Sequence, residues 1–85
     1  NYSKEIGLLK ALAHPVRLRM VDGLLRQECN VNKIVAKLKL PQSTVSQHLR
    51  ILKHQGIVVH RKEGVRACYR VTNDKVASLL KILGI

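Results

Sequence analysis

Aromatic residues are almost absent from this sequence: it contains no Phe and no Trp, and only Tyr2 and Tyr69 carry aromatic rings besides histidine. Any hydrophobic core must therefore be aliphatic. Apolar residues still make up 46% of the chain, which suits a folded domain and argues against disorder. The aromatic stacking surface that is common in readers of single-stranded RNA is missing.

Long apolar runs and a cysteine framework are missing as well. No stretch is long enough to cross a membrane, and no secretory signal pattern is present, so we expect a cytoplasmic protein. Two cysteines, Cys29 and Cys68, are too few for a disulfide scaffold. We expect reduced thiols at both positions, with a redox pair or sensor as the alternative.

Acidic residues are scarce, and this scarcity is local. The chain has 16 Lys and Arg residues against 5 Asp and Glu, and residues 31–70 hold nine of the former against one of the latter. Such a basic surface suits nucleic acid or an anionic membrane, and the lack of aromatic anchors disfavours the membrane. An enzyme is disfavoured too, because no catalytic triad, carboxylate pair, phosphate loop or metal cluster is visible.

The 85 residues predict one small domain that is mainly α within the α+β class, in the order α-α-α-α-β-β-α. Ser3 can cap the first helix and Asn73 or Thr72 the last, while Pro15 and Pro41 suit first helical turns. Gly56 ends the fourth helix. The expected helices cover residues 3–13, 15–27, 31–39, 41–55 and 73–84, and a hairpin follows the fourth helix over 57–71.

The third and fourth helices are so closely spaced that they must cross steeply, as in a helix-turn-helix over residues 31–55. Val45, Leu49 and Leu52 define the inward face of the fourth helix. Its short uncharged polar side chains can reach base edges in a major groove, unless they merely form a solvated face. The candidate base-reading residues are Gln42, Ser43, Thr44, Ser46, Gln47 and His48, although His48 lies at the inward edge and could equally pack inside.

Basic residues flank this helix and continue into the hairpin. Lys and Arg side chains position a protein on DNA by contacting phosphates without reading sequence. A β-hairpin with a basic tip beside such a helix is a wing, although its charges could also simply protect an exposed strand edge. The candidate phosphate or wing residues are Lys33, Lys37, Lys39, Arg50, Lys53, Arg61, Lys62 and Arg66.

Three segments carry a resemblance to a known family. These segments are AHPVRLRMV in the second helix, LPQSTVSQHLRILKHQGIV in the fourth and RKEGVRACYRV in the hairpin. Their combination is specific for one family, whereas any one of them alone would be weaker evidence. The chain resembles the ArsR/SmtB family of bacterial winged-helix transcriptional repressors, over nearly all 85 residues. This resemblance implies a winged helix-turn-helix that binds an inverted-repeat operator in double-stranded DNA and releases it when an inducer signals.

The resemblance also implies a homodimer formed by the first and last helices. Both helices carry apolar stripes, and so small a domain would gain stability from a partner chain. The alternative is that the stripes only cover the core of one chain. The candidate interface residues are Ile6, Leu9, Val76, Leu79, Leu80 and Leu83.

The departures from the family pattern concern the residues that sense the inducing signal in other members. Where many members have a Cys-x-Cys metal box, this chain reads ECNVNKI, with Asn30 and Asn32 at the thiolate positions. Asn is a poor ligand for soft transition metals. The last helix offers Asp74 but no His for the second metal site of the family. We therefore expect no metal and no cofactor, and the inducer is unknown.

Three rival interpretations stay open: a general RNA- or nucleoid-binding protein, a thiol-based redox-sensing repressor using Cys29 and Cys68, and an interaction domain that has lost DNA binding. Basic charge alone does not separate DNA from RNA. The operator, the regulated genes, and repression as opposed to activation are likewise not encoded in these motifs.

Overall fold

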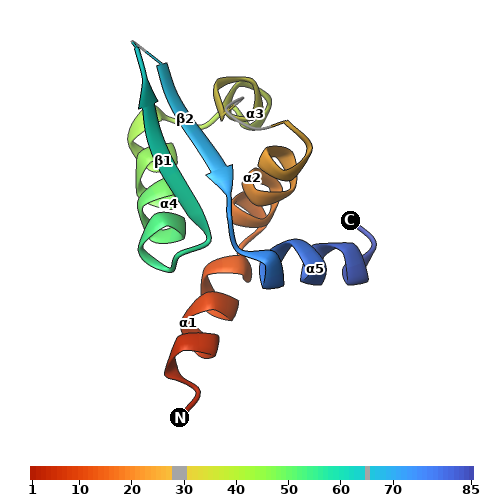
Figure 1. The fold of residues 1–85 in the computed structure, drawn as a ribbon. Coiled ribbons are helices and arrows are strands. Elements are labelled where there is room, and N and C mark those ends of the chain that lie inside the picture. The colour runs from red at the N-terminus through yellow and green to blue at the C-terminus, as the bar shows by residue number, and fades with distance from the viewer. Residues whose placement is uncertain (28–30, 65) are drawn as a thin grey trace.

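The structure is a computed structural model that describes residues 1–27, 31–64 and 66–85. The elements follow the order predicted from the sequence (Figure 1). Among the described helices, none combines the length and the apolar character needed to span a membrane. The elements are α1 (Ser3–Leu12), α2 (Pro15–Arg26), α3 (Val31–Leu38), α4 (Gln42–His54), β1 (Val58–Glu63), β2 (Arg66–Val71) and α5 (Asp74–Leu83).

Local chemistry explains where α2 and α5 begin. The Nδ1 atom of His14 accepts a hydrogen bond from the backbone N–H of Val16 at 3.1 Å, and Pro15 is the first residue of α2. Asn73 Oδ1 accepts from the N–H groups of Lys75 at 3.0 Å and Val76 at 3.3 Å. Each cap satisfies donors that have no partner within the helix, and both starts agree with the sequence prediction.

The start of α1 differs from the prediction. Ser3 is the first residue of the helix and does not cap it. Instead, Asn1 Oδ1 accepts from the N–H of Ser3 at 2.9 Å and from its hydroxyl at 2.7 Å. The amide of Asn1 lies two residues further back along the chain, where it can reach a donor in the first turn.

The hairpin is a two-stranded antiparallel sheet whose register runs from Val58 opposite Val71 to Glu63 opposite Arg66. Because side chains alternate across a strand, Tyr69 lies on the same face of β2 as Val71, which packs against the core, and the buried Cys68 lies on the opposite face. The Tyr69 ring stacks on that of His60, its partner across the ladder, with ring centroids 4.7 Å apart. This pair joins the two strands near their middle.

The core is centred on α2, whose Met20, Val21 and Leu24 are fully buried. This helix contacts α1, α3, α4 and β2. As the composition predicted, the core is aliphatic, and burying each such side chain contributes about 1.5–3 kcal/mol. The other fully or nearly fully buried side chains are Ala11, Leu12, Val31, Val45, Leu49, Leu52, Ile57, Val58, Cys68, Val76 and Leu80.

Helices α1 and α5 extend from the body at the end away from the hairpin tip (Figure 1). Ile6 and Leu9 on α1 and Leu83 on α5 are about half exposed, at 49%, 52% and 59%. Val76 and Leu80, which the sequence assigned to the dimer interface, are instead part of the core of the chain itself. The first turns of α5 pack inward, so only its C-terminal end presents large apolar side chains.

Gly23 allows α2 and α3 to approach closely, and this contact yields a stability prediction. A Cβ at position 23 would lie 2.7 Å from Cδ1 and 2.8 Å from Cγ1 of Ile34. Overpacking of this kind costs about 1–3 kcal/mol, which exceeds the helix-propensity gain of about 1 kcal/mol. We expect Gly23→Ala to lower the free energy of unfolding by about 1 kcal/mol in urea denaturation.

The matched control is Gly7→Ala in α1, where the new Cβ meets only the end of the Gln55 side chain, with Oε1 at 2.5 Å. That flexible end can move aside, so the control should be neutral or stabilising. Equal effects of the two substitutions would contradict the close α2–α3 contact.

Lys39, between α3 and α4, has a left-handed backbone conformation, with φ of +53°. This conformation costs a residue other than glycine about 1–2 kcal/mol. Lys39→Gly should therefore raise the free energy of unfolding by about 0.5–1 kcal/mol, after the larger backbone entropy of glycine is subtracted. Lys39→Ala removes the same charge but keeps the strain, so thermal unfolding should show no gain for it.

Candidate nucleic-acid interface

The outer face of α4 is polar and uncharged over its first two turns. Gln42, Ser43, Ser46 and Gln47 are exposed, and Thr44 is half-buried. The opposite face holds Val45, Leu49 and Leu52, which are buried in the core and keep the helix in place. Five of the six predicted base-reading residues thus lie on one end of one helix.

The N-terminal end of α4 is itself suited to a negative ligand. Its N-cap residue is Pro41, which makes no side-chain cap hydrogen bond. The first N–H groups of a helix have no partner within it, and the helix dipole places partial positive charge there. The left-handed turn at Lys39 brings α3 directly before this end.

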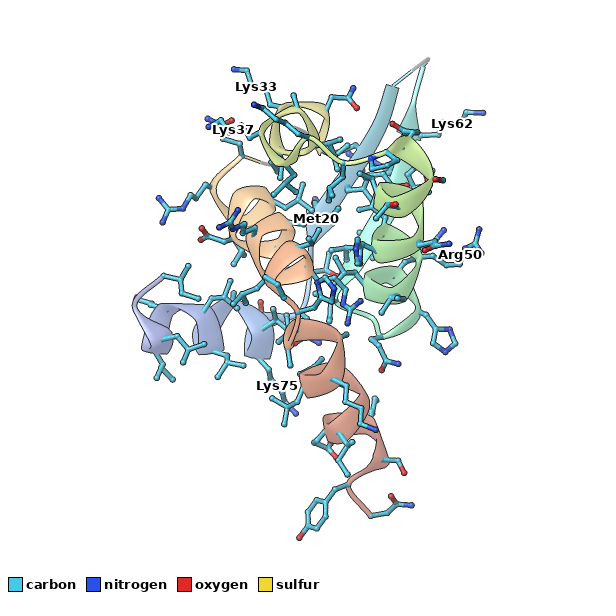
Figure 2. The ribbon with its side chains drawn as sticks, turned by 180° about the vertical axis from the view of Figure 1, so that it is seen from behind. Met20, Lys33, Lys37, Arg50, Lys62 and Lys75 are labelled. Atoms are coloured by element: carbon cyan, nitrogen blue, oxygen red, sulfur yellow. The ribbon has the colours of Figure 1, made fainter. Side chains whose placement is uncertain are left out.

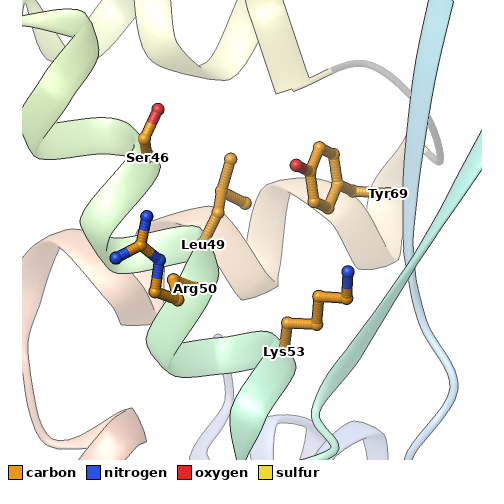
Figure 3. A pocket seen from close by; sticks show the side chains of 5 residues that line it. All are labelled: Ser46, Leu49, Arg50, Lys53 and Tyr69. Atoms are coloured by element: carbon orange, nitrogen blue, oxygen red, sulfur yellow. The ribbon is translucent and has the colours of Figure 1, made fainter.

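A hollow of about 250 Å³ lies between α4 and the hairpin and is lined by Ser46, Leu49, Arg50, Lys53 and Tyr69 (Figure 3). Tyr69 projects from β2 toward α4, while the other four side chains belong to α4 itself. Two cationic groups and two hydroxyls around one hollow match the hydrogen-bonding needs of a phosphate.

Tyr69 was not among the residues predicted to bind DNA, although its neighbours Arg50 and Lys53 were. The sequence indicated only that Tyr69 follows Cys68 in a strand. Because side chains alternate along a strand, this showed that the two side chains lie on opposite sides, but it did not show how close Tyr69 lies to α4.

The remaining basic residues are spread around α3 and the hairpin (Figure 2). Lys33 and Lys37 line a second hollow, of about 170 Å³, together with Arg26 at the α2–α3 contact. Lys62 belongs to β1 of the hairpin, and Lys75 lies away from both α3 and the hairpin, at α5. Lys39, Lys53, Arg61 and Lys62 are exposed, and the side chain of Arg66 lies outside the described part of the structure.

His48 faces inward from α4. The sequence predicted it as a base-reading residue, with packing inside the protein as the alternative. Its Nδ1 lies 3.3 Å from Nη1 of Arg17, and its ring centroid lies 4.6 Å from that of His14. Burial, then His14, then Arg17 lower the pKa of His48 below its ordinary value of 6.5. The ring is thus engaged by α2 and the α1–α2 junction, so we separate it from the five residues on the outer face.

The cysteines fall partly outside the described residues. Cys68 is buried and disulfide-bonded, which differs from the reduced thiol expected from the composition, whereas Cys29 lies outside the described residues. Within residues 1–27, 31–64 and 66–85, no group of three His, Cys, Asp or Glu side chains is placed to hold a metal ion. Asn30, one of the two residues in the metal-box positions, also lies outside the described ranges.

Comparison with known proteins identifies relatives of this arrangement. Residues 14–59, which include α2, α3 and α4, match the family described as "Bacterial regulatory protein, arsR family". The transcriptional repressor PagR of Bacillus anthracis is 46% identical over 78 residues, which cover 89% of this chain and 77% of PagR.

Solved structures agree with the sequence match. HlyU from Vibrio cholerae superposes with a TM-score of 0.88 at 36% identity, covering 98% of this chain and 90% of that one. A homodimeric winged helix-turn-helix DNA-binding domain from Mycobacterium bovis, a possible ArsR-family regulator, gives 0.83 at 33% identity, covering 95% of this chain and 75% of that one. With its recognition helix, hairpin and flanking helices in the same arrangement, this chain belongs to the arsR family of bacterial regulatory proteins.

Proposed function

We propose that this protein is a sequence-specific transcription regulator that binds double-stranded DNA as a homodimer, with α4 of each chain in a major groove. The observation that carries the proposal is the outer face of α4, where exposed uncharged polar side chains are bordered by Arg50 and Lys53. If this face of α4 only contacted water, nothing would require the charged residues of so basic a chain to be absent from it.

Discrimination between bases comes from the first two turns of α4. Gln42 and Gln47 can each pair with an adenine through two hydrogen bonds, and a well-formed pair of this kind contributes about 1–3 kcal/mol of discrimination. Ser43 and Ser46 can bond to any base edge, and the methyl of Thr44 can meet that of thymine. Short side chains allow the helix backbone to approach the groove floor.

The hollow between α4 and the hairpin is the proposed seat of one backbone phosphate. Arg50 and Lys53 would contribute charge-assisted hydrogen bonds, and the hydroxyls of Ser46 and Tyr69 would donate to the remaining oxygens. Because this phosphate lies between helix and hairpin, it would fix the rotation of α4 in the groove. The exposed Arg61 and Lys62 would extend the contact along the backbone or into the minor groove.

The dimer would form through the outer faces of α1 and the end of α5. Ile6, Leu9, Ile82 and Leu83 are all at least 49% exposed, and covering such large apolar side chains would favour association with a second chain. The homodimeric M. bovis relative supports this assembly. Twofold symmetry would set the two recognition helices about one DNA turn apart, on an inverted repeat.

The direction of regulation and the signal are separate matters. PagR is named a repressor and HlyU an activator, so membership of the family leaves the direction open. We propose repression, with α4 occupying an operator in the cytoplasm. The bonded state of Cys68 is a reason to compare oxidised and reduced protein, which distinguishes the thiol-based alternative from a regulator with no redox signal.

Selection of bound sequences from random duplex DNA, with and without metals, oxidant and reductant, is the experiment that tests the function. The selected duplex should bind about 10³-fold or more tightly than a scrambled duplex or a double-stranded RNA at the same salt concentration. We expect Ser43→Ala with Gln47→Ala, neither of which lines the phosphate hollow, to remove about tenfold or more of this preference and to leave the scrambled duplex unaffected.

Arg50→Gln is the contrasting variant. Loss of a phosphate contact should weaken every duplex and reduce the slope of log affinity against log salt by about one. Equal affinity of the unaltered protein for all three nucleic acids would favour general nucleic-acid binding and overturn the proposal.

A charged residue introduced on α1 tests dimer formation. Ile6→Glu places a carboxylate at the centre of the proposed interface, so light scattering and analytical ultracentrifugation should show a monomer. Val59→Glu is the matched control, because Val59 has a similar exposure of 41% but lies on β1. A monomeric unaltered protein, or a dimer that survives Ile6→Glu, would refute this interface.

A further inference from the structure

We propose that Arg17 is a positioning residue for DNA binding: it fixes α4 relative to α1 through His48, and protonation of His48 releases this contact and weakens operator binding. The proposal rests on the function proposed above and adds to it a built-in sensitivity to acid. It concerns residues of three separate helices that meet behind the DNA-facing surface.

Arg17 connects α2 to α1 and to α4, and all three nitrogens of its guanidinium group take part. Its Nε donates to the carbonyl of Ala11 at 2.6 Å, and Nη2 donates to that of Lys10 at 3.4 Å. The last carbonyls of a helix have no partner within it, so Arg17 caps the end of α1. The third nitrogen, Nη1, lies 3.3 Å from Nδ1 of His48 on α4.

The donor inventory determines the protonation state of His48. A guanidinium only donates, so Nδ1 of His48 must accept, and the ring is neutral with its proton on Nε2. The neighbouring His14 ring is held in place by the N–H of Val16, which donates to its Nδ1 at 3.1 Å. Adding a proton to Nδ1 of His48 would place an N–H group against a cation and end the hydrogen bond.

The surroundings of His48 oppose its protonation. The titratable and charged side chains that face this site among the described residues are His14 from the α1–α2 junction and Arg17 from α2. Burial acts in the same direction and is the largest cause of the lowered pKa of His48. The contact is therefore complete above pH of about 6.5 and is lost as pH falls through the lower pKa of the folded state.

This location explains why the contact would affect DNA binding. His48 follows Gln47 directly and lies one turn beyond Thr44, both on the proposed reading end of α4. At its other end, the contact reaches α1, the helix proposed for the dimer interface. Arg17 thereby controls the angle between each recognition helix and the dimer, and a palindromic site requires both helices at one fixed spacing.

The decisive variant is His48→Asn, because the Asn side-chain oxygen lies near the position of Nδ1, accepts from Arg17 and does not titrate. Affinity for the selected duplex would be measured from pH 8 to pH 5.5 at constant ionic strength. Above pH 7.5 the two proteins should bind alike, and by pH 5.5 the unaltered protein should bind about fivefold to tenfold more weakly than the variant.

Arg17→Ala tests the positioning role itself. It should weaken binding to the selected duplex about tenfold at pH 7.5, and in its background His48→Asn should have no further effect. Arg19→Ala is the matched control, since it removes the same charge from the exposed side of α2 and should lower the affinity for all duplexes slightly.

The outcomes separate the two proposals. If His48→Asn and the unaltered protein share one pH profile, or if Arg17→Ala binds the selected duplex as tightly as Arg19→Ala, the positioning role is wrong. Should Arg17→Ala fail to fold, as judged by circular dichroism, the His48→Asn comparison decides alone. If the unaltered protein shows no preference for any selected duplex, it is the DNA-binding function that fails.

Discussion

The packing of α2 against its neighbours is the constraint on which the rest of this structure depends. Without Phe or Trp, the core relies on many small aliphatic contacts, and these converge on Met20, Val21 and Leu24. Helix α4 is held against this centre by its own buried face. Because the inner face of α4 secures its position, the outer face needs no apolar residue and is available for ligand recognition.

Affinity and discrimination are divided between different residue types. Long-range attraction to phosphates depends on Lys and Arg, which lie at α3, along α4 and in the hairpin, and it is weakened by salt. Base discrimination depends on short uncharged groups whose hydrogen bonds require contact geometry. A chain of net charge +11 would bind any polyanion, and in the proposed function the polar end of α4 would distinguish one duplex from another.

Local chemistry allowed much of this fold to be predicted. The helix starts at Pro15 and Asn73 and the stop at Gly56 depend on a few adjacent residues. Features that join distant segments were not predictable in this way. Helical periodicity marked Val76 and Leu80 as apolar but could not tell a core from an interface, and the approach of Tyr69 to α4 required the hairpin's position.

The contact of Arg17 with His48 joins residues 31 apart in sequence, and it links one histidine to the angle at which α4 would meet DNA. Protonation of His48 frees α4 from its attachment to α1. The attraction of Lys and Arg to phosphates does not depend on this contact. Acid would therefore reduce the preference for one sequence while leaving the non-specific attraction to any duplex in place, because charge needs no fixed angle whereas base recognition does.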